Sequence, residues 1–89
     1  TDKILDIGTG NGVLCQKLRE KKYRVIPLDI KNLSFTKEVK PVLYDGTNIP
    51  FKDKYFDVAL LITMLHHTPL PEKILSEAKR VAKKIIIIE

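Results

Sequence analysis

The chain has 89 residues, 44% of them hydrophobic and 30% charged, and a formal net charge of +5. This balance fits one globular domain, residues 1–89, with a modest core. No run of about 18 apolar residues predicts a membrane span, and the one cysteine, Cys15, excludes an internal disulfide. A lone thiol suits a cytoplasmic protein. The basic residues are scattered rather than gathered in a tract, which disfavours nucleic acid as a direct partner.

Short aliphatic runs predict strands, and amphipathic stretches with helix-boundary signals predict helices. The predicted strands are Lys3–Ile7, Arg24–Leu28, Pro41–Tyr44, Asp57–Ile62 and Ile85–Ile88. The predicted helices are Gly12–Lys22 and Thr68–Lys83. We expect Leu14 and Leu18 to share the apolar face of the first helix, and Asp29–Lys40 to form a loop with a short helical turn. Pro27 predicts a bend or a gap in the hydrogen-bond ladder of the second strand.

Alternation of β and α elements predicts a parallel sheet with right-handed crossovers, and hence an open α/β fold. The fourth predicted strand is almost wholly apolar, so we expect it to be central and covered on both faces. The four isoleucines at residues 85–88 predict a fully buried fifth strand. Ligands of such sheets bind beyond the carboxyl ends of the strands, here near Gly8, Asp29, Asp45 and Thr63.

Three alternate glycines follow the first predicted strand in ILDIGTGNG. Glycine permits positive φ and lets a ligand approach the backbone closely. The spacing G-x-G-x-G differs from the dinucleotide fingerprint G-x-G-x-x-G, because Val13 stands where the third glycine would be. Asp6 precedes the loop and suits a ligand with a positive amine better than a bare pyrophosphate.

Two more acids lie at the ends of the next two predicted strands. Asp29 could accept both ribose hydroxyls of a nucleoside, or it could be a solvated turn residue. Asp45 could accept from an exocyclic amine such as that of adenine, or it could cap its own Asp-Gly turn.

These stretches resemble class I S-adenosylmethionine-dependent methyltransferases in order along nearly the whole chain. ILDIGTGNG is similar to the family's first motif, YDGTNIPFKDKYFDVALLITMLHH to its third and fourth motif region, and EAKRVAKKIIIIE to the helix and strand that follow. The resemblance is closest to the small-molecule branch often labelled type 11. It implies S-adenosylmethionine as cofactor, a Rossmann-like sheet of order 3-2-1-4-5, and in-line transfer of the methyl group to a small-molecule nucleophile.

The resemblance also implies roles for residues at the methionine end of the cofactor. Gly8, Gly10 and Gly12, with Thr9 between them, would pack under the methionine part. Asp6 would orient the methionine amine, directly or through water.

For the adenosyl end, the resemblance implies that Asp29 holds the ribose hydroxyls and Ile30 lies against adenine. Asp45 would bind the adenine amine, with the backbone of Gly46 and Thr47 close to the ring.

Thr63 and Met64 would sit near the methyl sulfonium. The adjacent His66 and His67 are candidates for a general base, although a pair satisfied by backbone groups is the alternative. No metal site is expected, because only Cys15 could add a thiolate and adjacent histidines diverge.

The sequence departs from the family between Asp29 and Asp45, where a shorter segment predicts a reduced or missing second helix. It also lacks the helical segment before the first strand and the antiparallel strands after the fifth. We therefore expect a piece of a longer protein, or self-association through the exposed edge of strand five. A non-catalytic module with this fold and a nicotinamide-dependent oxidoreductase are the alternative functions.

Overall fold

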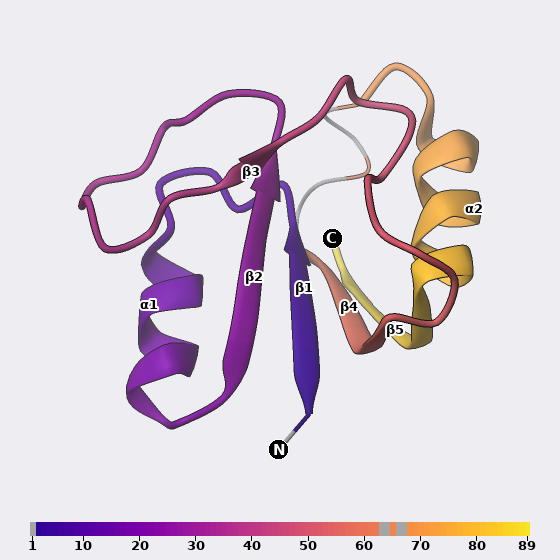
Figure 1. The fold of residues 1–89 in the computed structure, drawn as a ribbon. Helices are drawn as coiled ribbons and strands as arrows, with labels where there is room; N and C mark the ends of the chain where they lie inside the picture. The colour runs from indigo at the N-terminus through magenta and orange to yellow at the C-terminus, as the bar shows by residue number, and fades with distance from the viewer. Residues whose placement is uncertain (1, 63–64, 66–67) are drawn as a thin grey trace.

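The computed structural model describes residues 2–62, 65 and 68–89 and contains one sheet of five parallel strands (Figure 1). The strands are β1 (Lys3–Ile7), β2 (Arg24–Asp29), β3 (Val42–Leu43), β4 (Phe56–Ile62) and β5 (Ala82–Ile88). The helices are α1 (Val13–Glu20) and α2 (Pro71–Val81). The strand order is β3-β2-β1-β4-β5, which confirms the predicted Rossmann-like topology. No antiparallel pair joins this sheet among the described residues.

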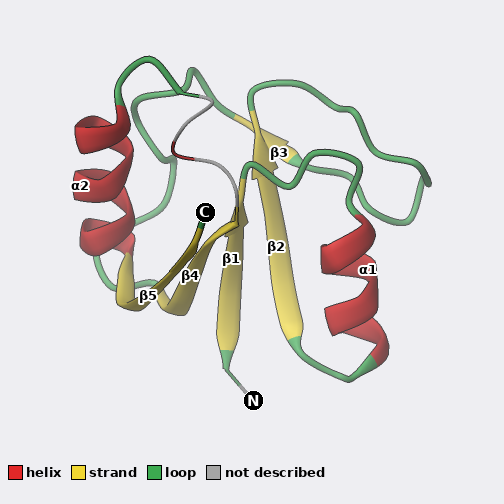
Figure 2. Cartoon of the chain, turned by 180° about the vertical axis from the view of Figure 1, so that it is seen from behind, coloured by secondary structure: helices red, strands yellow, loops and turns green. Residues whose placement is uncertain are grey.

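The two helices cover opposite faces of the sheet (Figure 2). Side chains alternate along β1, so Ile4 enters the cluster that contains Cys15 of α1, while Leu5 enters the cluster that contains Ile74 of α2. β4 contributes to both clusters in the same way: Leu60 lies in the cluster of Cys15, and Ala59 and Leu61 lie in the cluster of Ile74. The prediction that β4 is covered on both faces is confirmed; β4 lies inside the sheet between β1 and β5, while β1 is the central strand.

Helix α1 is shorter than predicted and turns a different face inward. It ends at Glu20 because Lys22 adopts a φ of 74°, which no α-helix accommodates. Cys15 is fully buried, whereas Leu14 is 37% exposed. The expectation that Leu14 faces the core is therefore wrong: Cys15, one position later, meets the sheet.

Strand β5 begins directly after α2, at Ala82 rather than at Ile85, because its ladder with β4 starts at the pair Phe56–Ala82. The prediction of a fully buried strand is wrong, since Ile86, Ile87 and Ile88 are 46%, 46% and 54% exposed. Among the described strands β5 pairs with β4 alone, so it forms an edge of the sheet. The expected self-association needs such an unpaired strand edge.

The segment between β2 and β3 contains no helix, which confirms the predicted reduction. Pro27 leaves β2 unbroken and pairs in register with Asp6. The Leu28 carbonyl points toward the β1 side and the Asp29 carbonyl toward β3, so the nitrogen of Pro27 also faces the β3 side. β3 first pairs at Leu28, so the missing N–H costs no ladder bond.

The connection from β3 to β4 is fixed to α2 by one arginine. Arg80 donates to both carboxylate oxygens of Glu77 (2.8 and 3.0 Å) and to the carbonyls of Ile49 and Phe51 (both 2.8 Å). Glu77 is 9% exposed and also accepts from the N–H of Ile49 (2.8 Å). Phe51 packs against the core. The loop that follows Asp45 is therefore held rigidly beside α2.

No helix in the described part of the chain is long and apolar enough to cross a membrane.

Candidate cofactor site

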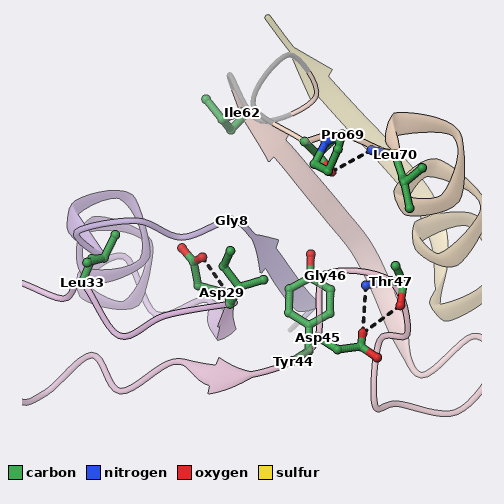
Figure 3. Close-up of a pocket in the computed structure, with 12 residues that line it drawn as sticks. Gly8, Asp29, Leu33, Tyr44, Asp45, Gly46, Thr47, Ile62, Pro69 and Leu70 are labelled. Carbon is green, nitrogen blue, oxygen red and sulfur yellow. Dashed lines mark hydrogen bonds between the residues drawn. The ribbon is translucent and has the colours of Figure 1, made fainter.

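A cavity of about 660 Å³ lies beyond the carboxyl ends of β1, β2, β3 and β4 (Figure 3). Its volume falls within the range of about 300–1,000 Å³ that is usual for small-molecule sites. The described residues that line it are Gly8, Asp29, Ile30, Leu33, Tyr44, Asp45, Gly46, Thr47, Ile62, Thr68, Pro69 and Leu70. It thus spans the junction of β1 and β4, where the strand order of the sheet reverses.

The glycine loop turns its backbone donors into the protein. The N–H groups of Gly8 and Thr9 both donate to the Leu28 carbonyl (2.8 and 3.0 Å), and that of Gly12 donates to the Thr9 carbonyl (3.0 Å). The N–H of Gly10 donates to Asp29 (2.8 Å). A loop that cradles phosphate needs such N–H groups to point at the anion. These four are already committed to partners within the chain.

Asp29 ends β2 and holds two backbone groups. Its Oδ2 accepts from Gly10, and its Oδ1 accepts from the N–H of Ile30 (2.7 Å). A carboxylate has about four lone-pair sites. Because Asp29 also lines the cavity, the remaining lone pairs can accept from hydroxyls of a ligand.

Asp45 caps its own turn, which is the alternative that the sequence left open for it. Its Oδ1 accepts from the N–H groups of Thr47 and Asn48 (both 2.8 Å) and from the Thr47 hydroxyl (3.0 Å). These bonds hold the pKa of the carboxyl well below its usual range. Its Oδ2 accepts only the longer bond from the Asn48 side chain (3.3 Å), so this oxygen retains capacity on the cavity wall.

Tyr44 lies between these two acids in sequence and space (Figure 3). Burial, followed by the negative charges of Asp29 and Asp45, raises the pKa of its hydroxyl to about 12. The group is therefore a neutral donor and acceptor at neutral pH.

Asp6 and Thr9 lie beneath the site and do not line it. Asp6 is 3% exposed, and its Oδ2 accepts from the Thr9 hydroxyl (2.8 Å). Burial raises the pKa of this carboxyl, against the opposite effect of the Thr9 bond. The pair fixes the start of the glycine loop.

Gly10 and Gly12 also lie outside the cavity lining, but for different reasons. A Cβ on Gly12 would meet Val39 Cγ1 at 2.7 Å, so this glycine allows the loop between β2 and β3 to pack on α1. A Cβ on Gly10 would meet nothing within 4 Å.

Six predicted cofactor residues therefore meet at the cavity: Gly8, Asp29, Ile30, Asp45, Gly46 and Thr47. Sequence reasoning missed Leu33, Tyr44, Ile62, Thr68, Pro69 and Leu70 as lining residues. Their position at the end of a predicted strand could have indicated Tyr44 and Ile62. Thr63, Met64, His66 and His67, which were also predicted, lie outside the described residues.

Comparison with known proteins identifies the family. The model of a methyltransferase-domain family, called Methyltransferase domain, matches residues 5–87, nearly the whole chain. The chain belongs to this methyltransferase family. S-adenosylmethionine is the cofactor that the family and its solved members imply.

Two curated relatives are similar to nearly the whole of this chain. An uncharacterised protein of Methanocaldococcus jannaschii is 35% identical over 86 residues, which cover 93% of this chain and 42% of the relative. A ubiquinone biosynthesis O-methyltransferase of Hahella chejuensis is 24% identical over 92 residues, covering 91% of this chain and 39% of the relative. The methyltransferase domain thus spans less than half the length of these curated relatives.

A solved SAM-dependent methyltransferase from Aquifex aeolicus has the same arrangement. It superposes with a TM-score of 0.79 at 27% identity, over 97% of this chain and 55% of that one.

The residues of the cavity suit this cofactor. Asp29 and Asp45 offer acceptors only, which match the hydroxyl and amine donors of an adenosyl group. Gly46 has a φ of +90°, and a Cβ built there would lie in ordinary contact with Ile30 Cγ2 at 3.6 Å, so the two residues adjoin on the cavity wall. The buried Asp6 adds negative charge below the glycine loop, where a positive amine is expected.

Proposed function

We propose that this domain binds S-adenosylmethionine in the cavity and forms the cofactor-binding part of an enzyme that methylates a small-molecule nucleophile. The observation that carries the proposal is the pairing of two acceptor-only carboxylates on the cavity wall with a glycine loop whose donors face inward. The match to a methyltransferase family supports the same function.

The cofactor supplies a methyl group that is bound to a sulfonium sulfur. When the methyl group is transferred, the rest of the cofactor leaves as a neutral thioether. What the protein adds is mainly orientation, because the leaving group needs no further activation. In the proposal, Asp29 accepts from the ribose hydroxyls and Ile30 packs on the adenine. The Oδ2 of Asp45, which keeps lone-pair capacity beside its long bond from Asn48, accepts the adenine amine, with Gly46 and Thr47 beside the ring.

At the methionine end, Gly8 gives the cavity a wall without a side chain. Asp6 and Thr9 act one layer below, where their hydrogen bond positions the loop and the Asp6 charge favours an amine. Gly10 and Gly12 keep the loop in its left-handed turns, with φ of 58° and 83°. Thr63 and Met64 complete the proposed site near the sulfonium, and His66 and His67 stay candidates for a base.

Binding of a nicotinamide dinucleotide fits the cavity less well. A pyrophosphate needs N–H donors or cations, whereas the N–H groups of Gly8, Thr9, Gly10 and Gly12 have partners in the chain. The carboxylate of Asp45 would also repel it.

Calorimetric titration with S-adenosylhomocysteine, with NADH as the comparison ligand, tests the proposal. We expect binding of the first ligand only, and loss of most of that binding in Asp29→Asn. Binding of NADH alone would contradict the proposal. Failure of both ligands to bind, even when the domain is extended on both sides, would contradict it as well.

A further inference from the structure

The cavity has two chemically different sides (Figure 3). Asp29, Tyr44 and Asp45 lie on the side of β2 and β3, whereas Ile62, Pro69 and Leu70 lie across from them at the end of β4 and the start of α2. The one polar side chain of this second side among the described lining residues is Thr68, whose hydroxyl accepts from the N–H of Leu70 (3.4 Å). The chain carries 16 lysines and arginines, yet none of them is among the described residues that line the cavity. The positive charge of the chain is therefore not directed at this site.

The rim of the same cavity is apolar and open to solvent. Leu70, on the side of β4 and α2, is 49% exposed; Ile30 and Leu33, which follow β2 and of which Ile30 is assigned to adenine, are 55% and 61% exposed. Large apolar side chains left exposed beside a cavity mark a surface that binds apolar groups.

An anionic ligand would meet unfavourable surroundings on this side. It would lose hydration on entry without gaining a cationic partner from the described lining. It would also approach the fixed negative charges of Asp29 and Asp45.

We infer that the methyl acceptor taken up against Ile62, Pro69 and Leu70 is a small, uncharged molecule with an apolar body, and not an anion. This inference rests on the proposed function, because it names the substrate class of the same site. The net charge of +5, taken by itself, would instead favour an anionic acceptor.

Leu70 allows this wall to be tested without weakening the fold. It is the N-cap residue of α2 and has no side-chain cap hydrogen bond. Leu70→Ser removes the apolar side chain and offers a hydroxyl of the kind preferred at this position. Leu43→Ser is the matched control, since Leu43 is 56% exposed on β3 and does not line the cavity.

The probes are 1-naphthol and 1-naphthyl phosphate, which share one ring system and differ in charge. The chain has no tryptophan, so fluorescence of the naphthyl ring can be excited without protein background. We expect 1-naphthol to bind at least about tenfold more tightly than its phosphate. Leu70→Ser should weaken naphthol binding about fivefold, raise the melting temperature, and leave the calorimetric affinity for S-adenosylhomocysteine within about twofold. Leu43→Ser should change none of these affinities.

Equal or tighter binding of the phosphate would overturn the inference, as would undetectable naphthol binding or an unchanged naphthol affinity in Leu70→Ser. Parallel loss of naphthol and S-adenosylhomocysteine in that variant would overturn the assignment of this wall to the acceptor. Selective naphthol binding without any binding of S-adenosylhomocysteine would support the apolar character of the wall and overturn the proposed function instead.

Discussion

The Oδ2 atom of Asp29 lies 2.8 Å from the backbone nitrogen of Gly10 and accepts its hydrogen bond across 19 residues of chain. This bond joins the carboxyl end of β2 to the glycine loop after β1. The other oxygen accepts from Ile30, so the carboxylate is fixed on both sides while it faces the cavity. Asp29 therefore shapes the loop and presents acceptors to a ligand.

Asp29→Asn should lower the affinity for S-adenosylhomocysteine about tenfold or more, because a hydrogen bond to a charged group contributes about 1.5–3 kcal/mol. The amide also replaces one of the two oxygens that accept from the N–H groups of Gly10 and Ile30 with an NH₂ donor. Calorimetry measures the change. Asp2→Asn is the control, since Asp2 is exposed near the chain start. Equal affinities of the two variants would contradict the assigned role.

Gly12→Ala should destabilise the fold by about 2–4 kcal/mol, since it combines a left-handed backbone with overpacking. The φ of Gly12 is 83°, and the new Cβ would lie 2.7 Å from Val39 Cγ1. Gly10→Ala is the matched comparison: its φ is 58° but its Cβ position is open. We expect it to cost only about 1–2 kcal/mol in urea unfolding. Val39→Ala removes the atom that the new Cβ would meet. If Gly12→Ala lowered the unfolding free energy as much in the Val39→Ala background as in wild type, steric contact would not be the cause.

Arg80→Met should cost about 2–3 kcal/mol of unfolding free energy, since it removes charge-assisted bonds to Glu77 and leaves two loop carbonyls without their donor. Because the same loop carries Asp45, cofactor affinity should fall as well. Lys79→Met, on the exposed side of the same helix, is the control in chemical denaturation. A variant as stable as this control would show that Arg80 does not hold the loop.

Acid should weaken the fold partly through Glu77. The hydrogen bond from Arg80 is the main cause that lowers its pKa from the ordinary value of 4.5. A carboxyl whose pKa is lower in the folded state stabilises above the unfolded pKa, and that contribution is lost as pH falls through the folded pKa. Glu77→Gln should therefore flatten the loss of stability below about pH 4.5.

Urea midpoints of wild type and variant at several pH values between about 3 and 7 give this difference directly. Asp6, whose pKa is raised by burial, acts in the opposite direction in both proteins and cancels from the comparison. Glu20→Gln, at an exposed position, should leave the slope unchanged. A slope for Glu77→Gln as steep as that of wild type would rule out Glu77 as a source of acid sensitivity.

The edge strand β5 should promote self-association of the isolated domain, because its outer backbone groups and exposed isoleucines can pair with a second copy. Sedimentation velocity at rising concentration should show dimers or larger species. Ile87→Lys should shift the population to monomer, whereas Leu43→Lys on the opposite edge should not. A wild-type monomer at every concentration would contradict this expectation.

The sequence by itself determined the order of the elements, the parallel sheet and the region of the site. Strand runs and helical periodicity are local properties, and acids directly after strands must gather at one edge of a parallel sheet. Gly8, Asp29 and Asp45 were found in this way. Element ends were less well determined, as the early start of β5 shows, because strand length depends on the partner strand.

Only the tertiary structure decided how each group is used. One carboxylate oxygen of Asp45 accepts hydrogen bonds from its own turn. Asp6 is buried and accepts from Thr9, and Leu70 lines the same cavity as Ile62. Each outcome depends on which neighbours lie within hydrogen-bond or van der Waals distance. Burial of a carboxyl, the partner of an N–H and the polarity of a cavity wall arise from residues far apart in the chain, so no local pattern encodes them.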